Sequence, residues 1–114
     1  IAKPKIDGKI DSMWASYIKK LGQQDNVYCK VSGMVTEASW GKWHKKEFVP
    51  YLDIVFESFG PERIMFGSDW PVCLLSGEYV DVLDIVQKYL LKFPKDVREK
   101  VMGLNAISIY DLSV

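Results

Sequence analysis

The stretch that most constrains the fold is Arg63 to Val72, which reads RIMFGSDWPV. Its apolar run is typical of a buried β-strand, which we expect at residues 63–68, and it ends in a Gly-Ser-Asp sequence. The proline that follows cannot continue a strand, because it has no amide hydrogen to donate. Residues 48–59 before it and 79–93 after it carry apolar side chains at helical spacing. A strand between helices predicts a parallel sheet, whose chemistry lies at the carboxyl ends of its strands, so Asp69 is the first candidate functional residue.

The rest of the chain follows the same two periodicities. Residues 27–33 alternate apolar and polar side chains as a strand does, and residues 1–6 have the character of a strand exit, because Pro4 restricts Lys3 to extended conformations. Helices are expected at residues 12–22, 45–59, 78–93, 95–102 and 106–112, the first capped by Asp11 or Ser12, the fourth ending at Gly103 and the last capped by Asn105. Two strands and a strand exit cannot close a barrel, so residues 1–114 are expected to be one segment from the last part of a larger α/β fold.

Composition excludes several classes of protein. Fifteen basic and fifteen acidic residues cancel, so no net charge favours nucleic acid or an anionic membrane as a partner. No stretch approaches the roughly twenty apolar residues of a membrane span. Cys29 and Cys73 form neither a disulfide framework nor a metal motif, which indicates a reduced, cytoplasmic setting. Four Trp, six Tyr and five Phe are many for 114 residues and suggest an aromatic-lined pocket.

Residues Phe59 to Val72, FGPERIMFGSDWPV, resemble the last-strand motif of the amidohydrolase-related family of lactone hydrolases. That group includes fuconolactonase-like, rhamnonolactonase-like and pyrone-dicarboxylate lactonase-like proteins. Residues 1–4, 26–37 and 103–110 resemble further segments of this family in the same order. The resemblance implies the C-terminal part of a TIM (β/α)₈ barrel, which as a whole takes about 250 residues. It also implies hydrolysis of a lactone, often of a sugar acid, by water activated at the barrel rim, with a divalent metal such as Zn or Mn in some members.

Four residues are candidates for the site that the resemblance implies. Asp69 would be the general base and, where a metal is present, a metal ligand; its alternative role is to cap the following turn. Trp70 would form a pocket wall for the lactone ring or simply pack over the rim. Glu37 would orient substrate or remain a solvated loop residue. Lys3 would bind a carboxylate or oxyanion, or belong to a plain strand exit.

Two other polar residues are expected to lie outside the chemistry. His44 is the only histidine and is predicted to be a surface residue rather than a metal ligand. The histidines typical of the family are absent from this segment, so Asp69 alone is expected to bind metal weakly. Ser68 is expected to form a local hydrogen bond, because no base and no nucleophile elbow accompany it.

Two alternative functions remain open at this point. One is a decarboxylase of the wider amidohydrolase group, although the Trp70-Pro71-Val72 sequence favours the lactonase branch. The other is a catalytically inert truncated or structural chain that self-associates through open barrel edges. The leading hypothesis is a lactone hydrolase whose partner is a small-molecule lactone or carboxylate substrate.

Overall fold

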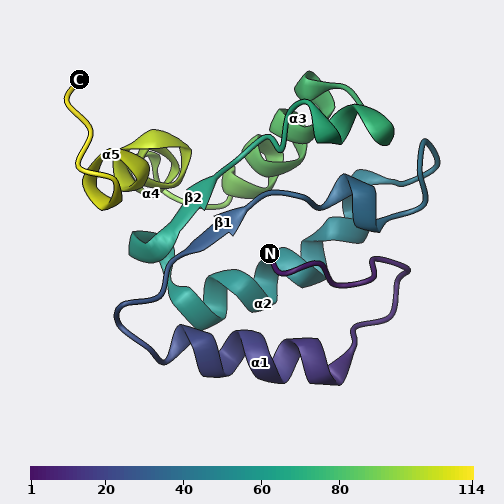
Figure 1. Cartoon of the computed structure of the whole chain (residues 1–114), viewed down its shortest axis with the longest axis horizontal. Helices are drawn as coiled ribbons and strands as arrows, with labels where there is room; N and C mark the ends of the chain where they lie inside the picture. The colour runs from purple at the N-terminus through teal and green to yellow at the C-terminus, as the bar shows by residue number, and fades with distance from the viewer.

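The computed structural model describes all 114 residues and contains one two-stranded parallel sheet. Strand β1 (Cys29–Val31) pairs with β2 (Ile64–Phe66), with Cys29 opposite Ile64 and Val31 opposite Phe66 (Figure 1). The predicted parallel pairing is therefore confirmed. Each strand has three residues and is shorter than the predicted ranges 27–33 and 63–68.

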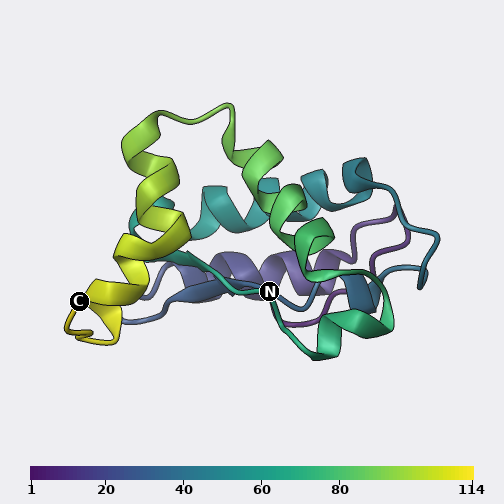
Figure 2. The ribbon, with the colours of Figure 1, turned by 90° about the horizontal axis from the view of Figure 1, so that it is seen from above.

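Five α-helices and five shorter turns surround the strands. Figures 1 and 2 show α1, α2 and α3 packed around the strands, with α4 and α5 at the end of the molecule where β2 begins. None of the helices is both long enough and apolar enough to cross a membrane. The helices are α1 (Ser12–Gly22), α2 (Val49–Phe59), α3 (Tyr79–Leu90), α4 (Lys95–Glu99) and α5 (Asn105–Ile109); the 3₁₀ turns are η1 (Val35–Glu37), η2 (Lys45–Phe48), η3 (Pro61–Arg63) and η4 (Val72–Leu75), and η5 (Lys100–Leu104) is a π-helical turn.

One hydrophobic core joins the strands to α1, α2 and α3. Cys29 and Val31 of β1 are buried in it while Lys30 is exposed, as the alternating pattern predicts. On β2, Ile64 faces the same core and is fully buried. One face of the sheet therefore supports the fold, and the face that carries Lys30 does not belong to this core.

Helix α1 begins and ends at identifiable contacts. Asp11 is its N-cap, because the Asp11 carboxylate accepts a hydrogen bond of 2.8 Å from the Met13 N–H. At the other end, the Arg63 guanidinium donates to the carbonyl of Gly22 at 2.5 Å. It also donates to the carbonyls of Gln24 and Val27 at 2.6 and 3.0 Å. A cation at a helix C-terminus satisfies free carbonyls and complements the helix dipole, so Arg63 fixes α1 against the start of β2.

The first six residues differ from the prediction in the conformation of Lys3. Ala2 and Lys3 have φ angles of 60° and 50°, so the prediction that Pro4 keeps Lys3 extended is wrong. The reason is tertiary. The Ile1 nitrogen donates to the carbonyls of Lys30 and Ser32, and the Ile6 N–H donates to the Glu37 carbonyl, so the chain between these two anchors must bend. This segment covers part of the free edge of β1.

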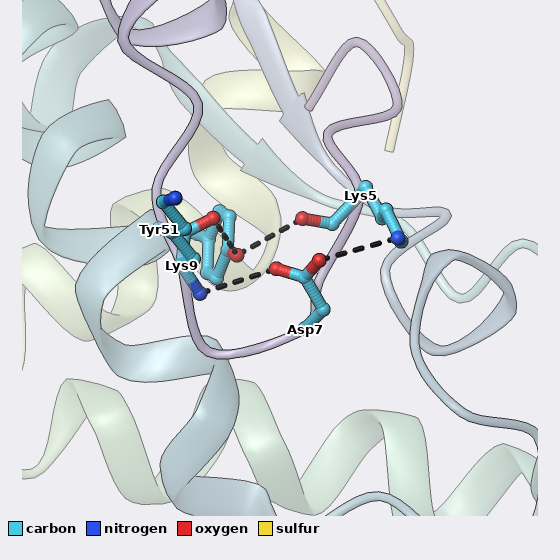
Figure 3. A network of polar contacts seen from close by, with 4 residues as sticks. All are labelled: Lys5, Asp7, Lys9 and Tyr51. Carbon is cyan, nitrogen blue, oxygen red and sulfur yellow. Dashed lines mark hydrogen bonds and ion pairs between the residues drawn. The ribbon is translucent and has the colours of Figure 1, made fainter.

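Tyr51 of α2 anchors the next part of the N-terminal segment (Figure 3). Its hydroxyl lies 3.0 Å from the Lys5 carbonyl and 3.4 Å from the Lys9 carbonyl. Asp7 closes the same loop, because its carboxylate accepts from the Lys9 N–H at 3.1 Å and lies 3.3 Å from the Lys5 ammonium. The buried tyrosine ring thus ties a surface loop to the core.

The C-terminal helices differ from the prediction. The chain does not end a helix at Gly103 but continues through η5 into α5. Asn105 is not a helix cap, because its buried side-chain amide donates to the Pro61 carbonyl at 2.6 Å and the Ile64 carbonyl at 2.8 Å. The local preferences of Gly and Asn for helix ends are overridden here by this long-range contact.

Candidate functional site

The Asp69 carboxylate lies just beyond the carboxyl ends of both strands. The Gly67 N–H donates to the Val31 carbonyl at 3.1 Å, so the strand pairing extends to one residue past β2. Two residues later the backbone of Asp69 adopts a φ of 58°, a left-handed conformation that Asp tolerates better than most residues. The half-buried Asp69 is thereby turned toward the end of β1.

Gly33, just past the end of β1, lies next to this carboxylate. A Cβ atom at Gly33 would lie 3.6 Å from Asp69 Oδ2, and the φ of Gly33 is 65°. Glycine is the residue that adopts such a φ without strain and lets a neighbouring group approach closely. Gly33 was not predicted as a site residue. The signal that could have found it is a glycine within two residues of the end of a strand, as Gly67 is at the end of β2.

The turn after Asp69 is closed by backbone atoms rather than by its carboxylate. The Cys73 N–H donates to the Asp69 backbone carbonyl at 2.8 Å, and the Asp69 side chain accepts no hydrogen bond from the turn. The alternative in which this side chain caps the turn is therefore wrong. Ser68 makes the local hydrogen bond that was predicted, because its hydroxyl accepts the Trp70 N–H at 3.2 Å.

The Asp69 carboxylate affects the pKa of the buried Cys73 thiol. Burial of this thiol raises its pKa, and the neighbouring negative charge of Asp69 raises it further. Cys73 is free and fully buried, so it remains a neutral packing residue beneath the turn.

Glu37 and Lys3 lie together on the rim beside β1. Glu37 is in η1, and Lys3 Nζ lies 4.0 Å from Glu37 Oε1. The Lys3 side chain is 84% exposed and that of Glu37 is 26% exposed, so this ion pair contributes at most about 1 kcal/mol to stability. Turn η1 packs against η4, which follows Asp69, so both strands deliver residues to one rim.

Trp70 is exposed and does not pack over the rim. The residue has 63% of its surface accessible. The main surface clefts of the chain are lined by other residues. Of the predicted site residues, Lys3 and Glu37 are in contact, Asp69 contacts the end of β1, and Trp70 is directed toward solvent.

Comparison with known proteins now identifies the family. Residues 1–112 match the family model described as amidohydrolase. The chain belongs to the amidohydrolase family.

L-fucono-1,5-lactonase from Burkholderia multivorans is 40% identical over 80 residues, which cover 67% of this chain and 27% of that protein. L-fucono-1,5-lactonase from Burkholderia ambifaria is 34% identical over 113 residues, covering 96% and 39%. L-rhamnono-gamma-lactonase from Scheffersomyces stipitis is 29% identical over 103 residues, covering 85% and 29%.

Solved amidohydrolase structures confirm the fold. A crystal structure of an amidohydrolase from Burkholderia multivorans with bound zinc superposes with a TM-score of 0.84 and 36% identity, covering 88% of this chain and 37% of that one. Amidohydrolase 2 from Bifidobacterium longum subsp. infantis has a TM-score of 0.68 at 21% identity, covering 92% and 36%, and shows the shared fold. This amidohydrolase chain is therefore part of a TIM barrel, and it spans well under half the length of these relatives.

The residues of this amidohydrolase chain do not by themselves fit a metal centre. No group of three or more His, Cys, Asp or Glu side chains lies close enough together to hold an ion. His44 is exposed and begins η2, where its ring accepts the Glu47 backbone N–H and the Glu47 carboxylate accepts the His44 N–H. Zinc sites in enzymes use three protein ligands, and the carboxyl ends of β1 and β2 supply one carboxylate, that of Asp69.

Proposed function

We propose that Asp69 of this amidohydrolase segment is a catalytic carboxylate in the hydrolysis of a lactone, with sugar-acid lactones as the substrate class. The observation that carries the proposal is the Asp69 carboxylate itself, which is free of hydrogen bonds and lies over Gly33 beyond the carboxyl ends of two parallel strands. Active sites of TIM barrels lie at this face. The relatives named fuconolactonase and rhamnonolactonase support a lactone rather than the substrate of a decarboxylase.

The chemistry requires a nucleophilic water, a group that stabilises the oxyanion and a proton for the leaving oxygen. Asp69 accepts a proton from water as the water oxygen bonds to the lactone carbonyl carbon. The tetrahedral intermediate then collapses, the ring C–O bond breaks, and the proton passes to the leaving alkoxide. The product is the open-chain hydroxy acid.

The other rim residues take supporting roles in this proposal. The exposed ammonium of Lys3 attracts the developing oxyanion or a substrate carboxylate, and Glu37 holds Lys3 at the rim through their ion pair. The exposed ring of Trp70 offers an apolar surface on which a lactone ring can lie.

Where the whole protein binds a divalent ion such as Zn or Mn, Asp69 is the residue of this chain that we propose as a ligand. We further propose that residues 1–114 belong to a single barrel domain, and the two free cysteines support a cytoplasmic location.

A chimera tests the proposed function. The matching region of the Burkholderia ambifaria lactonase, which aligns with 96% of this chain, is replaced by the residues of this chain, and hydrolysis of L-fucono-1,5-lactone is followed. We expect a folded, active chimera in which Asp69→Asn lowers kcat about 100-fold or more, because asparagine keeps the left-handed backbone but cannot accept the proton.

Asp111→Asn is the matched control, since Asp111 also has a positive φ, of 51°, but lies at the exposed C-terminal end. Equal activity of the Asp69→Asn and parent chimeras would contradict the catalytic role. An active chimera is also inconsistent with the inert alternative, in which the 114-residue chain is a structural piece that self-associates through its sheet edges.

A further inference from the structure

The two loops that follow the strands are joined by one side chain, that of Trp43. The first rim loop, residues 32–44, follows β1, and the second rim loop, residues 67–78, follows β2 and contains Asp69. The Trp43 indole N–H donates to the Ser76 carbonyl at 2.7 Å. Because these two residues are 33 positions apart in the chain, this hydrogen bond connects the two rim loops directly.

The Trp43 ring is held in place on both of its sides. It packs edge-on against the fully buried ring of Phe48, with ring centroids 5.2 Å apart. On the other side, a Cβ atom at Gly77 would lie 3.1 Å from the Trp43 ring, so the glycine leaves just enough room for the indole. The direction of the indole N–H is therefore set by packing, and the Ser76 carbonyl is its partner.

Backbone hydrogen bonds continue this connection from Ser76 back to Asp69. The N–H groups of Ser76 and Gly77 donate to the Cys73 carbonyl at 2.9 and 3.0 Å. The Cys73 N–H in turn donates to the Asp69 carbonyl at 2.8 Å. Residues 69–77 thus form one hydrogen-bonded unit that begins at Asp69 and is held at its far end by Trp43.

The side chains of η4 provide little further support for this unit within the chain. Cys73 is fully buried, but Val72, Leu74 and Leu75 are each about half exposed. The unit is therefore held by the packing of Cys73, by the contact of η4 with η1 and by the directional hydrogen bond from Trp43.

We propose that Trp43 is a positioning residue for Asp69. Its indole N–H fixes the second rim loop, and with it the direction of the Asp69 carboxylate, relative to the first rim loop. This inference rests on the proposed function, which gives Asp69 its catalytic role. Catalytic groups must be held within about 0.5 Å of their productive position, and a displacement of about 1 Å can cost about 100-fold in rate. Since Trp43 acts through Asp69, its loss should lower kcat and leave KM nearly unchanged.

The first test is Trp43→Phe in the chimera described above, with L-fucono-1,5-lactone as the substrate. Phenylalanine keeps a ring against Phe48 but leaves the Ser76 carbonyl without its donor. We expect kcat to fall about tenfold and KM to stay within about twofold of the parent value. Tyr89→Phe is the matched control, because it also removes one donor and keeps the ring, but at a bond to Asp53 between α2 and α3. It should leave kcat and KM unchanged.

Gly77→Ala disturbs the same contact from the other side. The added Cβ atom would press against the Trp43 ring, so kcat of the chimera should fall severalfold. In the Trp43→Phe chimera, whose smaller ring leaves space for the Cβ atom, Gly77→Ala should cause no further fall. Additive losses in the double variant would show that the two residues act separately and would overturn the proposal.

Amide hydrogen exchange tests the positioning role without any substrate. In the 114-residue chain, Trp43→Phe should speed the exchange of the Cys73 and Gly77 amides about fivefold, and Tyr89→Phe should leave it unchanged. Unchanged exchange in Trp43→Phe overturns the proposal, as does a Trp43→Phe chimera that keeps the parent kcat or changes in KM alone. An inactive parent chimera, or full activity of Asp69→Asn, instead contradicts the catalytic role of Asp69.

Discussion

The two ends of strand β2 are built in opposite ways. At the amino end, Arg63 donates to three carbonyl groups and the Asn105 amide donates to two more. At the carboxyl end, Asp69 has a positive φ and a carboxylate without hydrogen bonds, and Trp70 is exposed. Polar groups at the amino end of β2 are therefore paired with hydrogen-bond partners that stabilise the fold. At the carboxyl end, where we propose the chemistry, the Asp69 carboxylate has no such partner. This division between a stabilising face and a catalytic face is general for TIM barrels.

The largest loss of stability is expected from a substitution that disturbs the close packing near the amino end of the strands. A Cβ at Gly22 would lie 2.1 Å from the Ser58 carbonyl oxygen of α2, and this backbone atom cannot move aside without displacing a helix. Gly22→Ala should lower the free energy of unfolding by about 3 kcal/mol, measured by urea denaturation. Gly103→Ala is the control, because no atom lies within 4 Å of a Cβ at that position, and it should be neutral or stabilising.

Removal of the Arg63 guanidinium is the next largest effect. Arg63→Met keeps an unbranched apolar stem but leaves the carbonyls of Gly22, Gln24 and Val27 without their donor. The expected loss is about 2 kcal/mol in urea denaturation. Arg98→Met, at the only other arginine, should cost much less because Arg98 makes no ion pair. Similar losses in the two variants would refute the role given to Arg63.

Asn105 offers a test that separates two roles for one side chain. Serine is a good helix cap, so Asn105→Ser would be tolerated if Asn105 capped α5. Because the amide instead holds the Pro61 and Ile64 carbonyls, we expect a loss of about 1.5 kcal/mol. Asn26→Ser, at an exposed position, is the reference. A thermal unfolding midpoint unchanged in Asn105→Ser would restore the capping interpretation.

Substitutions at Asp69 test whether the carboxyl end of β2 contributes to the stability of the fold. Asp69→Asn should keep the free energy of unfolding within about 0.5 kcal/mol, since asparagine also tolerates a positive φ. Asp69→Ala should lower it by about 1 kcal/mol, because alanine lacks this tolerance. Chemical denaturation of both variants measures the difference. A loss in Asp69→Asn as large as that of Arg63→Met would mean that the carboxylate stabilises the fold.

The smallest expected effect concerns the outer helices. The Tyr89 hydroxyl donates to the Asp53 carboxylate at 2.7 Å, and this bond, with the nearby Lys92 ammonium, holds the pKa of Asp53 below its usual 3.8. A lowered folded-state pKa gives stability above the unfolded pKa that is lost as pH falls through the folded pKa. The half-exposed pair contributes well under 1 kcal/mol.

Asp53→Asn should therefore lose slightly less stability than the parent chain as the pH falls below about 5, as measured by urea midpoints. The same substitution at exposed Asp25 is the control. An acid sensitivity identical in the parent and Asp53→Asn chains would show that the Tyr89 contact has no energetic weight.

Much of this fold could be predicted from the sequence because its signals are local. The apolar alternation around Cys29, the cap at Asp11 and the breaks at proline identify elements within a few residues of their observed bounds. The errors at Lys3 and Asn105 share one cause: the backbone around each residue is held by contacts with segments about thirty or more residues away, which no local rule contains.

The candidate site was predictable only in part for a related reason. Asp69 is marked by the abrupt end of an apolar run, but Gly33 becomes a site residue only when β1 and β2 are paired in register.

The guanidinium of Arg63 also limits how this segment can be recombined with its relatives. Its three acceptors lie between Gly22 and Val27, so donor and acceptors come from opposite ends of one continuous stretch. A crossover point between residues 27 and 63 would draw the arginine and its carbonyls from different parents, and an insertion between Gly22 and Val27 would change the spacing of the acceptors. Residues 22–63 are therefore the smallest block that should be exchanged intact.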